Sequence, residues 1–325
     1  MASVRTPIRC ALAALLFAVQ ALALGQQYPN KPIRLFTGSV AGGGGDLTAR
    51  VIADRLGAAL KGQVVVENRA GATGMIANRL VAQSAPDGYT LLLEPSSFVA
   101  ISPLLNAKDG WDPREKLAPI IQVSSYPLVL VVHPSVPARN VRDFVALARK
   151  QPGVLNFASS GIGSNFHLAG EIFRLDTKIN VVHVPYRGSS SAVVDLLAGR
   201  ADFMFGLIPV LMPFMEQGRL RALAVTGKTR NALLPNVPTA DESGVPGLEV
   251  LSWEGVFAPV GTPPAIIDRL NTEIGKVVNS PQVKKIWEEK GVDTVTGSPA
   301  DLAKMVNGDY TRMDQLLKQL GITKQ

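Results

Sequence analysis

Cysteine and histidine are nearly absent from this chain. Cys10 is the only cysteine, and histidine occurs three times in 325 residues. A single thiol cannot form an internal disulfide. Cys10 also lies in an N-terminal segment that we expect to be removed, so thiol catalysis and cysteine-based metal or cluster sites are excluded. No H-E-x-x-H motif or comparable cluster indicates a metal, and we expect no metal and no other cofactor.

Hydrolase and nucleotide-binding motifs are also missing. The serine-rich stretch SSGIGS does not supply the nucleophile elbow G-x-S-x-G. Gly42 and Gly44 follow a predicted strand, but the third glycine of a G-x-G-x-x-G fingerprint would have to stand at Leu47. No P-loop lysine follows the glycines either. The sequence therefore gives no reason to expect catalysis or dinucleotide binding.

The charged residues do not gather into a basic tract. Lys and Arg number 33, against 26 Asp and Glu, which gives a net charge of +7. Removal of Arg5 and Arg9 with the N-terminal segment leaves 31 against 26, or +5. Without a basic cluster we expect no nucleic-acid partner, whereas a mildly positive surface suits an anionic ligand.

Residues 1–25 predict a secretory signal peptide. Two arginines precede the apolar run ALAALLFAVQALAL, and the small residues after it fit cleavage after Ala23 or Gly25. The 14 residues of this run are fewer than the roughly 20 that span a bilayer, although an uncleaved anchor helix is the alternative. We therefore expect an exported, periplasmic protein of about 300 residues, which is large enough to bury a core without disulfides.

Strand-like and helix-like segments alternate along the rest of the chain. Apolar strand patterns such as residues 89–95 and 179–186 stand next to amphipathic segments that begin at glycine-rich or serine-rich turns. This alternation predicts an α/β fold of mostly parallel sheets flanked by helices. The last two predicted helices, near 281–290 and 299–320, lack strands of their own, so we expect them to pack on an existing domain.

The alternating pattern restarts once, which predicts two α/β domains of ordinary size. We expect domain 1 to comprise residues 26–127 and 253–325, and domain 2 to comprise residues 128–252. The chain would then cross between the domains twice. The extended segments near 126–132 and 250–257 are the expected connections.

Four consecutive glycines stand between a predicted strand and a predicted helix. In LFTGSVAGGGGDLTARVIADRLGAAL, Ala41 to Gly45 directly precede Asp46, where we expect the helix to begin. Glycine at a helix start is entropically unfavourable, so we expect these glycines to have a role that outweighs the entropic cost of ordering them. A helix N-terminus offers unpaired N–H groups at the sheet edge where parallel α/β folds bind ligands. We therefore predict an anion-binding loop at Ala41–Gly45, with Asp46 capping the helix.

Two turns in the second half of the chain carry further hydrogen-bond donors. In NFASSGIGSNFHLAGE, the loop between strand and helix contains Ser159, Ser160, Ser164 and Asn165. The alternative is that Ser164 is simply an N-cap. A cap needs one hydroxyl, however, and this loop has two more, on Ser159 and Ser160, before its two glycines. In PYRGSSSAVV, Arg187 either pairs with a carboxylate or is a solvated surface charge.

The histidines differ in what their positions indicate. We expect His133 and His183, at a strand end and inside an apolar strand, to be structural. His167 lies in the first turn of the helix after the serine loop and could contact a ligand. Ser96 and Ser97 follow a strand of the first half and belong at the same sheet edge. Loops from both halves therefore offer neutral donors and helix N-termini, which suit a carboxylate.

The chain resembles the Bug-type extracytoplasmic solute receptors, the substrate-binding components of tripartite tricarboxylate transporters. The resemblance covers nearly all of the mature chain. It implies a two-domain periplasmic-binding-protein clamshell, or Venus flytrap, that binds a small carboxylate between its domains and catalyses nothing. The segments that carry it are, in order, YPNKPIRLF, AGGGGDLTARVIADRL, VVVENRAGATG, APDGYTLLL, NFASSGIGSNFHLAGE, VVHVPYRGSSSAVVDLLAGRADFMF, LRALAVT and GTPPAIIDRLN.

Loop position and resemblance together define the expected ligand-binding set. Its members belong to the glycine loop, the serine loop and the turns beside them. They are Ser39, Ala41, Gly42, Gly43, Gly44, Gly45, Ser96, Ser97, Ser159, Ser160, Gly161, Gly163, Ser164, Asn165, His167, Tyr186, Arg187 and Gly206.

The chain departs from the usual family pattern at three places. Gly45 stands where relatives usually have a hydroxyl residue, and Gly38-Ser39-Val40 stand where many have Pro-Phe-Pro. Gly206 and Leu207 replace an Asp-Asn pair whose acid can receive an ammonium group in relatives that bind amino acids. We therefore expect a carboxylate without a positive charge, in a pocket that is larger or more apolar than usual.

The resemblance also implies membrane components of a tripartite tricarboxylate transporter as partners, with the receptor itself a monomer. Two other functions stay open. The same clamshell could pass its occupancy to a membrane kinase as a sensor. A secreted hydrolase using Ser160 or Ser164 is the second alternative.

Overall fold

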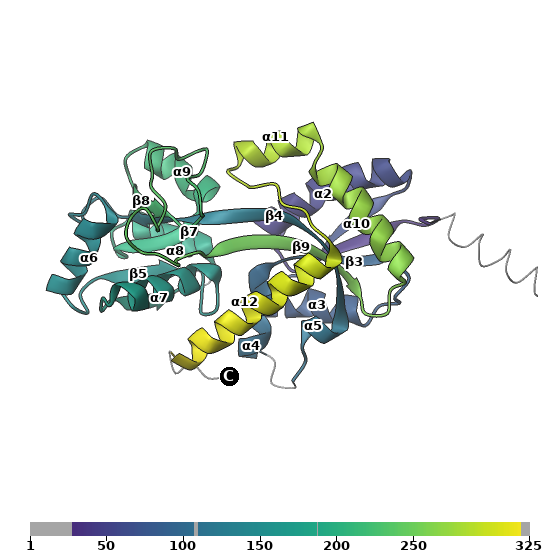
Figure 1. The fold of residues 1–325 in the computed structure, drawn as a ribbon, viewed down its shortest axis with the longest axis horizontal. Helices are drawn as coiled ribbons and strands as arrows, with labels where there is room; N and C mark the ends of the chain where they lie inside the picture. The colour runs from purple at the N-terminus through teal and green to yellow at the C-terminus, as the bar shows by residue number, and fades with distance from the viewer. Residues whose placement is uncertain (1–27, 107–109, 187, 320–325) are drawn as a thin grey trace, which may run out of the picture.

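The computed structural model describes residues 28–106, 110–186 and 188–319 (Figure 1). The predicted signal peptide and Arg187 lie outside these residues. None of the helices in this part of the chain combines the length and the hydropathy of a membrane span.

A mixed sheet forms the frame of the molecule. Within the described residues, nine strands pair in the order β2-β1-β3-β9-β4-β7-β5-β6, and β8 pairs with β4. β1 is parallel to β2 and β3, and β5 is parallel to β6 and β7, whereas β4 and β9 pair antiparallel with each other and with their other neighbours. The strands are β1 Ile33–Thr37, β2 Val64–Asn68, β3 Thr90–Pro95, β4 Leu117–Val132, β5 Asn156–Ser159, β6 Val182–Pro185, β7 Phe203–Leu207, β8 Arg221–Val225 and β9 Leu251–Pro259.

Two halves of the molecule are joined by β4 and β9. We call the half built on β1, β2 and β3 the first lobe, and the half built on β5 to β8 the second lobe. β4 pairs with β9 from Leu117 to Pro127, then with β7 and β8 as far as Val132. Figure 1 shows both strands running between the lobes. The crossing segments expected near 126–132 and 250–257 are thus confirmed as parts of β4 and β9, while the domain boundaries themselves stay a proposal.

Helices flank both faces of the sheet. Helix α2 begins at Gly44, two residues before the predicted start. The first-lobe elements are α2 Gly44–Leu60, η1 Ala72–Gly74, α3 Met75–Ala82, η2 Ser97–Ile101, α4 Ser102–Asn106, α5 Pro113–Lys116, α10 Pro264–Val278, α11 Pro281–Glu289 and α12 Pro299–Gln319, and the second-lobe helices are α6 Val141–Lys150, α7 Asn165–Thr177, α8 Ser189–Leu197 and α9 Ile208–Glu216.

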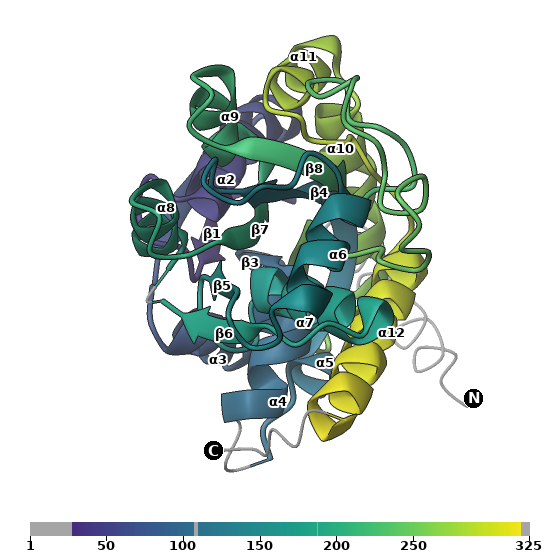
Figure 2. The ribbon, with the colours of Figure 1, turned by 90° about the vertical axis from the view of Figure 1, so that its left-hand side faces the viewer.

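The apolar cores also cross between the lobes. One cluster fills the first lobe between the sheet and α2, α10 and α11, and a second lies on the opposite face under α3 and the first half of α12. The second-lobe core takes in Ala100 to Leu105 of η2 and α4, and Met313 to Leu317 of α12. Helix α12 therefore packs on both lobes, as its diagonal course in Figures 1 and 2 shows.

Candidate functional site

The tetraglycine loop ends in a helix without a side-chain cap. Gly42 has φ +77°, a left-handed conformation that glycine adopts without strain. Gly43 is the N-cap of α2, and no side chain caps the amides behind it. The first N–H groups of a helix have no intrahelical partner, so the start of α2 keeps donors available to a ligand.

Asp46 has a different role from the predicted one. It does not cap α2; its carboxylate turns back and accepts a hydrogen bond from the amide of Gly42 at 2.9 Å. It also accepts from Arg50 Nε at 3.0 Å and from Asn68 Nδ2 at 3.0 Å. The hydrogen bond from Arg50 is the main cause that lowers the pKa of Asp46 below its ordinary value. Asp46 thus fixes the loop as a paired charge, which limits its repulsion of an anion at the helix start.

A hollow in the first lobe borders this helix start. Gly43, the N-cap of α2, and Gly71, the N-cap of the turn η1 that leads into α3, both line it, and neither helix start has a side-chain cap. Two helix N-termini therefore border one hollow. The α3 side of the hollow was not predicted from the sequence, although GATGM has the same arrangement of glycine before a helix. The lining residues are Gly38, Ser39, Val40, Gly43, Ala70, Gly71, Gly74 and Phe98.

Ser39 and Gly45 share one space within the loop. A Cβ placed on Gly45 would collide with Ser39 Oγ and would lie 3.4 Å from Thr37 Oγ1. The Ser39 hydroxyl thus occupies the room that a side chain at position 45 would need. Gly45 itself is buried, while Ala41, Gly42 and Gly44 are exposed.

The hydroxyls of the serine loop are largely engaged by the protein itself. Ser164 is the N-cap of α7: its Oγ accepts from the amide of His167 at 3.2 Å and donates to the carbonyl of Gly161 at 2.8 Å. Ser159 is fully buried, and its Oγ lies 2.7 Å from His183 Nε2. Ser164 is therefore an N-cap, as the alternative interpretation of the sequence expected. Ser160 is half-buried and remains the better placed of these hydroxyls to meet a ligand.

Three stacked aromatic rings lie next to the serine loop. His183 stacks on Phe157 with centroids 4.7 Å apart, and on His167 with centroids 4.1 Å apart. His167 Nδ1 accepts from the amide of Gly163 at 3.2 Å. Burial lowers the pKa of His167 to about 3 and that of His183 to about 4, so both rings are neutral at physiological pH.

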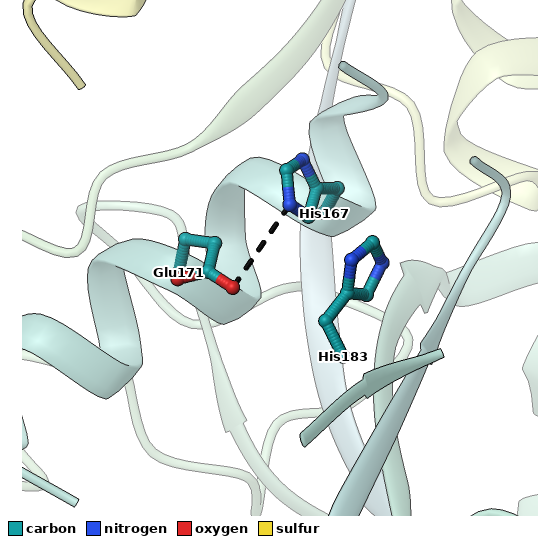
Figure 3. Close-up of side chains that lie close together, drawn as sticks. All are labelled: His167, Glu171 and His183. Carbon is teal, nitrogen blue, oxygen red and sulfur yellow. Dashed lines mark ion pairs between the residues drawn. The ribbon is translucent and has the colours of Figure 1, made fainter. Parts of the chain in front are cut away.

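His167, Glu171 and His183 place their ligand atoms within 4.8 Å of one another, the spacing of a metal site (Figure 3). The geometry fits packing better than coordination. The two imidazoles stack face to face, so their in-plane lone pairs do not converge on one point. Glu171 Oε2 also accepts from Arg174 at 2.7 Å, while His167 Nε2 is 3.9 Å from Glu171 Oε1. We interpret the group as a support for the serine loop.

The two lobes touch through predicted site residues. The side-chain amide of Asn165 donates to Ser96 Oγ at 2.9 Å, and both side chains are buried. A Cβ on Gly163 would collide with Leu105 of α4, so the serine loop approaches this helix closely. Ser97 begins the π-helical turn η2 beside them. No hydrogen bond between residues 39–45 and 159–165 is present, although the structure describes both loops in full.

The structure describes the turn PYRGSSSAVV except for Arg187. The hydroxyl of Tyr186 donates to Asp195 at 2.8 Å, so it is engaged within the second lobe. Gly206 is buried on β7 against Leu211, beside a small cavity that Phe166 and Ser189 also line. Gly161, with φ +126°, precedes the capped start of α7.

Comparison with known proteins identifies the family. The profile of the tripartite tricarboxylate transporter family receptor matches residues 48–322. BugT of Bordetella pertussis is 36% identical over 295 residues, covering 90% of each chain. An R. palustris protein solved with adipate superposes with a TM-score of 0.82 at 34% identity, over 92% of this chain and 100% of its own. MatC from Rhodopseudomonas palustris with bound malate gives a TM-score of 0.76 at 27% identity, over 89% of this chain and 100% of its own.

These similarities confirm three predictions from the sequence. The fold is the two-domain α/β fold of periplasmic binding proteins. The family and its solved neighbours are solute-binding proteins rather than enzymes, so the hydrolase alternative is set aside. The chain belongs to the family of Bug-type receptors of tripartite tricarboxylate transporters.

Proposed function

We propose that the protein captures a small carboxylate without a positive charge between the tetraglycine loop and the serine loop. It then delivers this ligand to the membrane components of a tripartite tricarboxylate transporter. The observation that carries the proposal is the start of α2, where Gly43 is an N-cap without a side-chain partner and Arg50 neutralises Asp46. An uncapped helix N-terminus beside a paired acid favours an anion.

The second lobe and the relatives both support the proposed ligand class. Gly206 and Leu207 offer no charge that could receive an ammonium group. The relatives solved with adipate and malate hold dicarboxylates, which carry no ammonium group. Ser39, Gly43, Gly44, Ser160 and the α7 N-terminus are the groups that we propose to contact the ligand.

Capture would proceed by closure of the lobes. A ligand that bridges both lobes binds the closed form better and shifts the equilibrium towards it. β4 and β9, the two strands that join the lobes, would take up the rotation. The released ligand would pass to membrane partners, with the receptor acting as a monomer in the periplasm.

Calorimetric titration tests the ligand class. The mature protein is titrated separately with adipate, malate, aspartate and glutamate. We expect heat of binding with a dicarboxylate and none with the two amino acids. Tight binding of aspartate or glutamate without a response to adipate or malate would contradict the proposal. Small-angle scattering with and without the bound acid then measures closure, which should reduce the radius of gyration.

A further inference from the structure

Two buried polar atoms on one face of the first-lobe sheet have no hydrogen-bond partner among the residues that the structure describes. These are Glu94 Oε2 and Asn78 Oδ1, and both side chains are fully buried. An unpaired buried polar atom costs about 1–3 kcal/mol, so a native structure rarely leaves one without a reason. Neither residue belongs to the site predicted from the sequence.

Glu94 lies where the glycine loop meets helix α3. It is the penultimate residue of β3, and its side chain shares a sheet face with Leu92, which packs beneath α3. Its Oε1 accepts from the amide of Gly38 at 2.7 Å. A Cβ on Gly38 would lie 2.6 Å from Glu94 Oε1 and 2.7 Å from Gly74 Cα, so only glycine fits at position 38.

Asn78 approaches the same region from α3. It stands one helical turn beyond Gly74, and its Nδ2 donates to the carbonyl of Phe98 at 3.0 Å. That bond fixes which end of the amide is nitrogen, so the unpaired atom is an acceptor. A second acceptor, as in a carboxylate, cannot satisfy it. A carboxylic acid has one O–H donor that can, either directly or through one water.

We infer that Glu94 is held as a neutral carboxylic acid and serves as a positioning residue, fastening Gly38 at the start of the glycine loop to Asn78 of α3. Its Oε1 accepts from Gly38, and its Oε2–H is directed to Asn78 Oδ1. This arrangement pairs both otherwise unsatisfied atoms with one proton. It also ties together the two walls of the hollow that contains both helix N-termini.

The electrostatic surroundings agree with a neutral Glu94. Burial, and then the negative charge of Glu254 on β9, raise the pKa of Glu94 well above its ordinary value. The groups shown beside Glu94 are uncharged: Gly38, which donates to its Oε1, and Gly74 and Phe98, which lie next to Gly38. Glu254 lies on the opposite face of the sheet, where it accepts from Tyr126 at 2.6 Å and Ser124 at 2.9 Å, and burial raises its pKa as well.

The first test compares thermal unfolding of the wild type and Glu94→Gln between pH 5 and pH 8.5. Glutamine keeps an acceptor for Gly38 and a donor for Asn78, so it mimics the neutral acid. Because the folded pKa of Glu94 is raised, its contribution to stability is complete below the unfolded pKa of about 4.3 and is lost as the pH rises. The difference in Tm between Glu94→Gln and the wild type should therefore grow in favour of the variant by roughly 3 °C for each unit by which the pH is raised.

Glu67→Gln is the matched control, a glutamate on β2 whose carboxylate accepts from Arg34, a hydrogen bond that lowers its pKa. It should leave most of the pH dependence in place. Parallel melting curves for the wild type and Glu94→Gln would overturn the inference. Infrared spectra of the wild type provide a second measurement that does not depend on a variant: a protonated-carboxyl band should persist at pH 7 and be absent in Glu94→Gln. Absence of that band from the wild type would also overturn it.

Ligand binding provides a further test of the inference, and this test rests on the proposed function. Adipate is titrated at pH 6 and pH 9 into the wild type and Glu94→Gln. The affinity of the wild type should fall several-fold at pH 9, and that of Glu94→Gln should change less. Failure of adipate to bind at either pH would count against the proposed ligand class and leave the melting result standing. Equal loss of affinity in both proteins would contradict the positioning role of Glu94.

Discussion

Asn165 Nδ2 donates a hydrogen bond to Ser96 Oγ at 2.9 Å, and this bond joins the first turn of α7 to the end of β3. Both residues were predicted to bind the ligand, yet in this structure they bind each other. Because both side chains are buried, the bond is protected from water. The serine loop is thus tied to the first lobe at a point beside the strands that join the lobes.

Substitution of Asn165 and Ser96 should reveal an energetic link between the lobes. A typical hydrogen bond contributes about 1 kcal/mol, and an unpaired buried amide costs more. We expect Asn165→Ala and Ser96→Ala each to lower the free energy of unfolding by about 1–2 kcal/mol, and the double variant to lose less than the sum. Urea unfolding of the four proteins measures this coupling. Strictly additive losses would show that the bond contributes nothing.

Gly44→Ala should weaken ligand binding without weakening the fold. Gly44 is exposed, its backbone is not left-handed, and an added Cβ would meet no atom within 4 Å. Alanine in a helix is about 1 kcal/mol more favourable than glycine, so stability should hold or rise. A methyl group over the helix start would obstruct a carboxylate, and we expect adipate affinity to fall at least tenfold.

Gly308→Ala is the matched control for that substitution, because Gly308 lies in α12 and also has open space around it. It should gain similar stability and keep the affinity of the wild type. Unchanged adipate affinity in Gly44→Ala would remove the α2 N-terminus from the proposed site.

The stacked histidines should make the protein sensitive to acid. The folded pKa values, about 3 for His167 and about 4 for His183, are depressed by burial from an ordinary value near 6.5. Their contribution is therefore present above pH 6.5 and is lost as the pH falls towards 4, by about 1.4 kcal/mol per pH unit for each ring.

The double variant His167→Asn, His183→Gln tests this loss. Asparagine places an oxygen near Nδ1 to accept from Gly163, and glutamine places a polar atom near Nε2 to meet Ser159. Urea unfolding at pH 7, 5.5 and 4.5 should show a flatter decline than in the wild type. Identical slopes would mean that these rings do not titrate on unfolding.

Ser39 and Gly45 should respond to substitution as a pair. Gly45→Ala alone collides with Ser39 Oγ and should destabilise the protein by about 1 kcal/mol or more. In the Ser39→Gly background this collision is removed and Thr37 Oγ1, 3.4 Å from the added Cβ, is an ordinary contact, so the change should be neutral or stabilising because alanine favours the helix. Chemical denaturation of the single and double variants measures the change of sign, and the same sign in both backgrounds would refute the pairing.

Much of the fold could be predicted from the sequence because its signals are local. The apolar strand at 89–95 and the helix that follows the four glycines can be recognised by periodicity and turn chemistry alone. The start of α2 was placed two residues late, since glycine is a weak helix former and Asp46 resembled a cap. Its carboxylate instead bonds Gly42, a choice that Arg50 and Asn68 determine.

The candidate site was harder to predict, because the sequence does not reveal which polar groups satisfy one another. Ser159 and Tyr186 carry the donors that a carboxylate needs, yet His183 and Asp195 already engage them. Glu94 was missed for the opposite reason: it sits in an apolar strand, and its meaning depends on Gly38 and Asn78, which are distant in sequence. Long-range partners of this kind appear only when the strands are paired.

The anchorage of η2, α4 and α12 also determines how the receptor can open. Apolar side chains of η2 and α12 lie in both the first-lobe and the second-lobe cores, and those of α4 lie in the second-lobe core, so these elements resist sliding of the lobes on that side. In Figure 2, α4 and α12 lie low in the view, whereas α2 and α8 lie towards the upper left. With β4 and β9 taking up the rotation, the lobes should therefore separate on the side away from α4 and α12, so that solute enters from the side of α2 and α8.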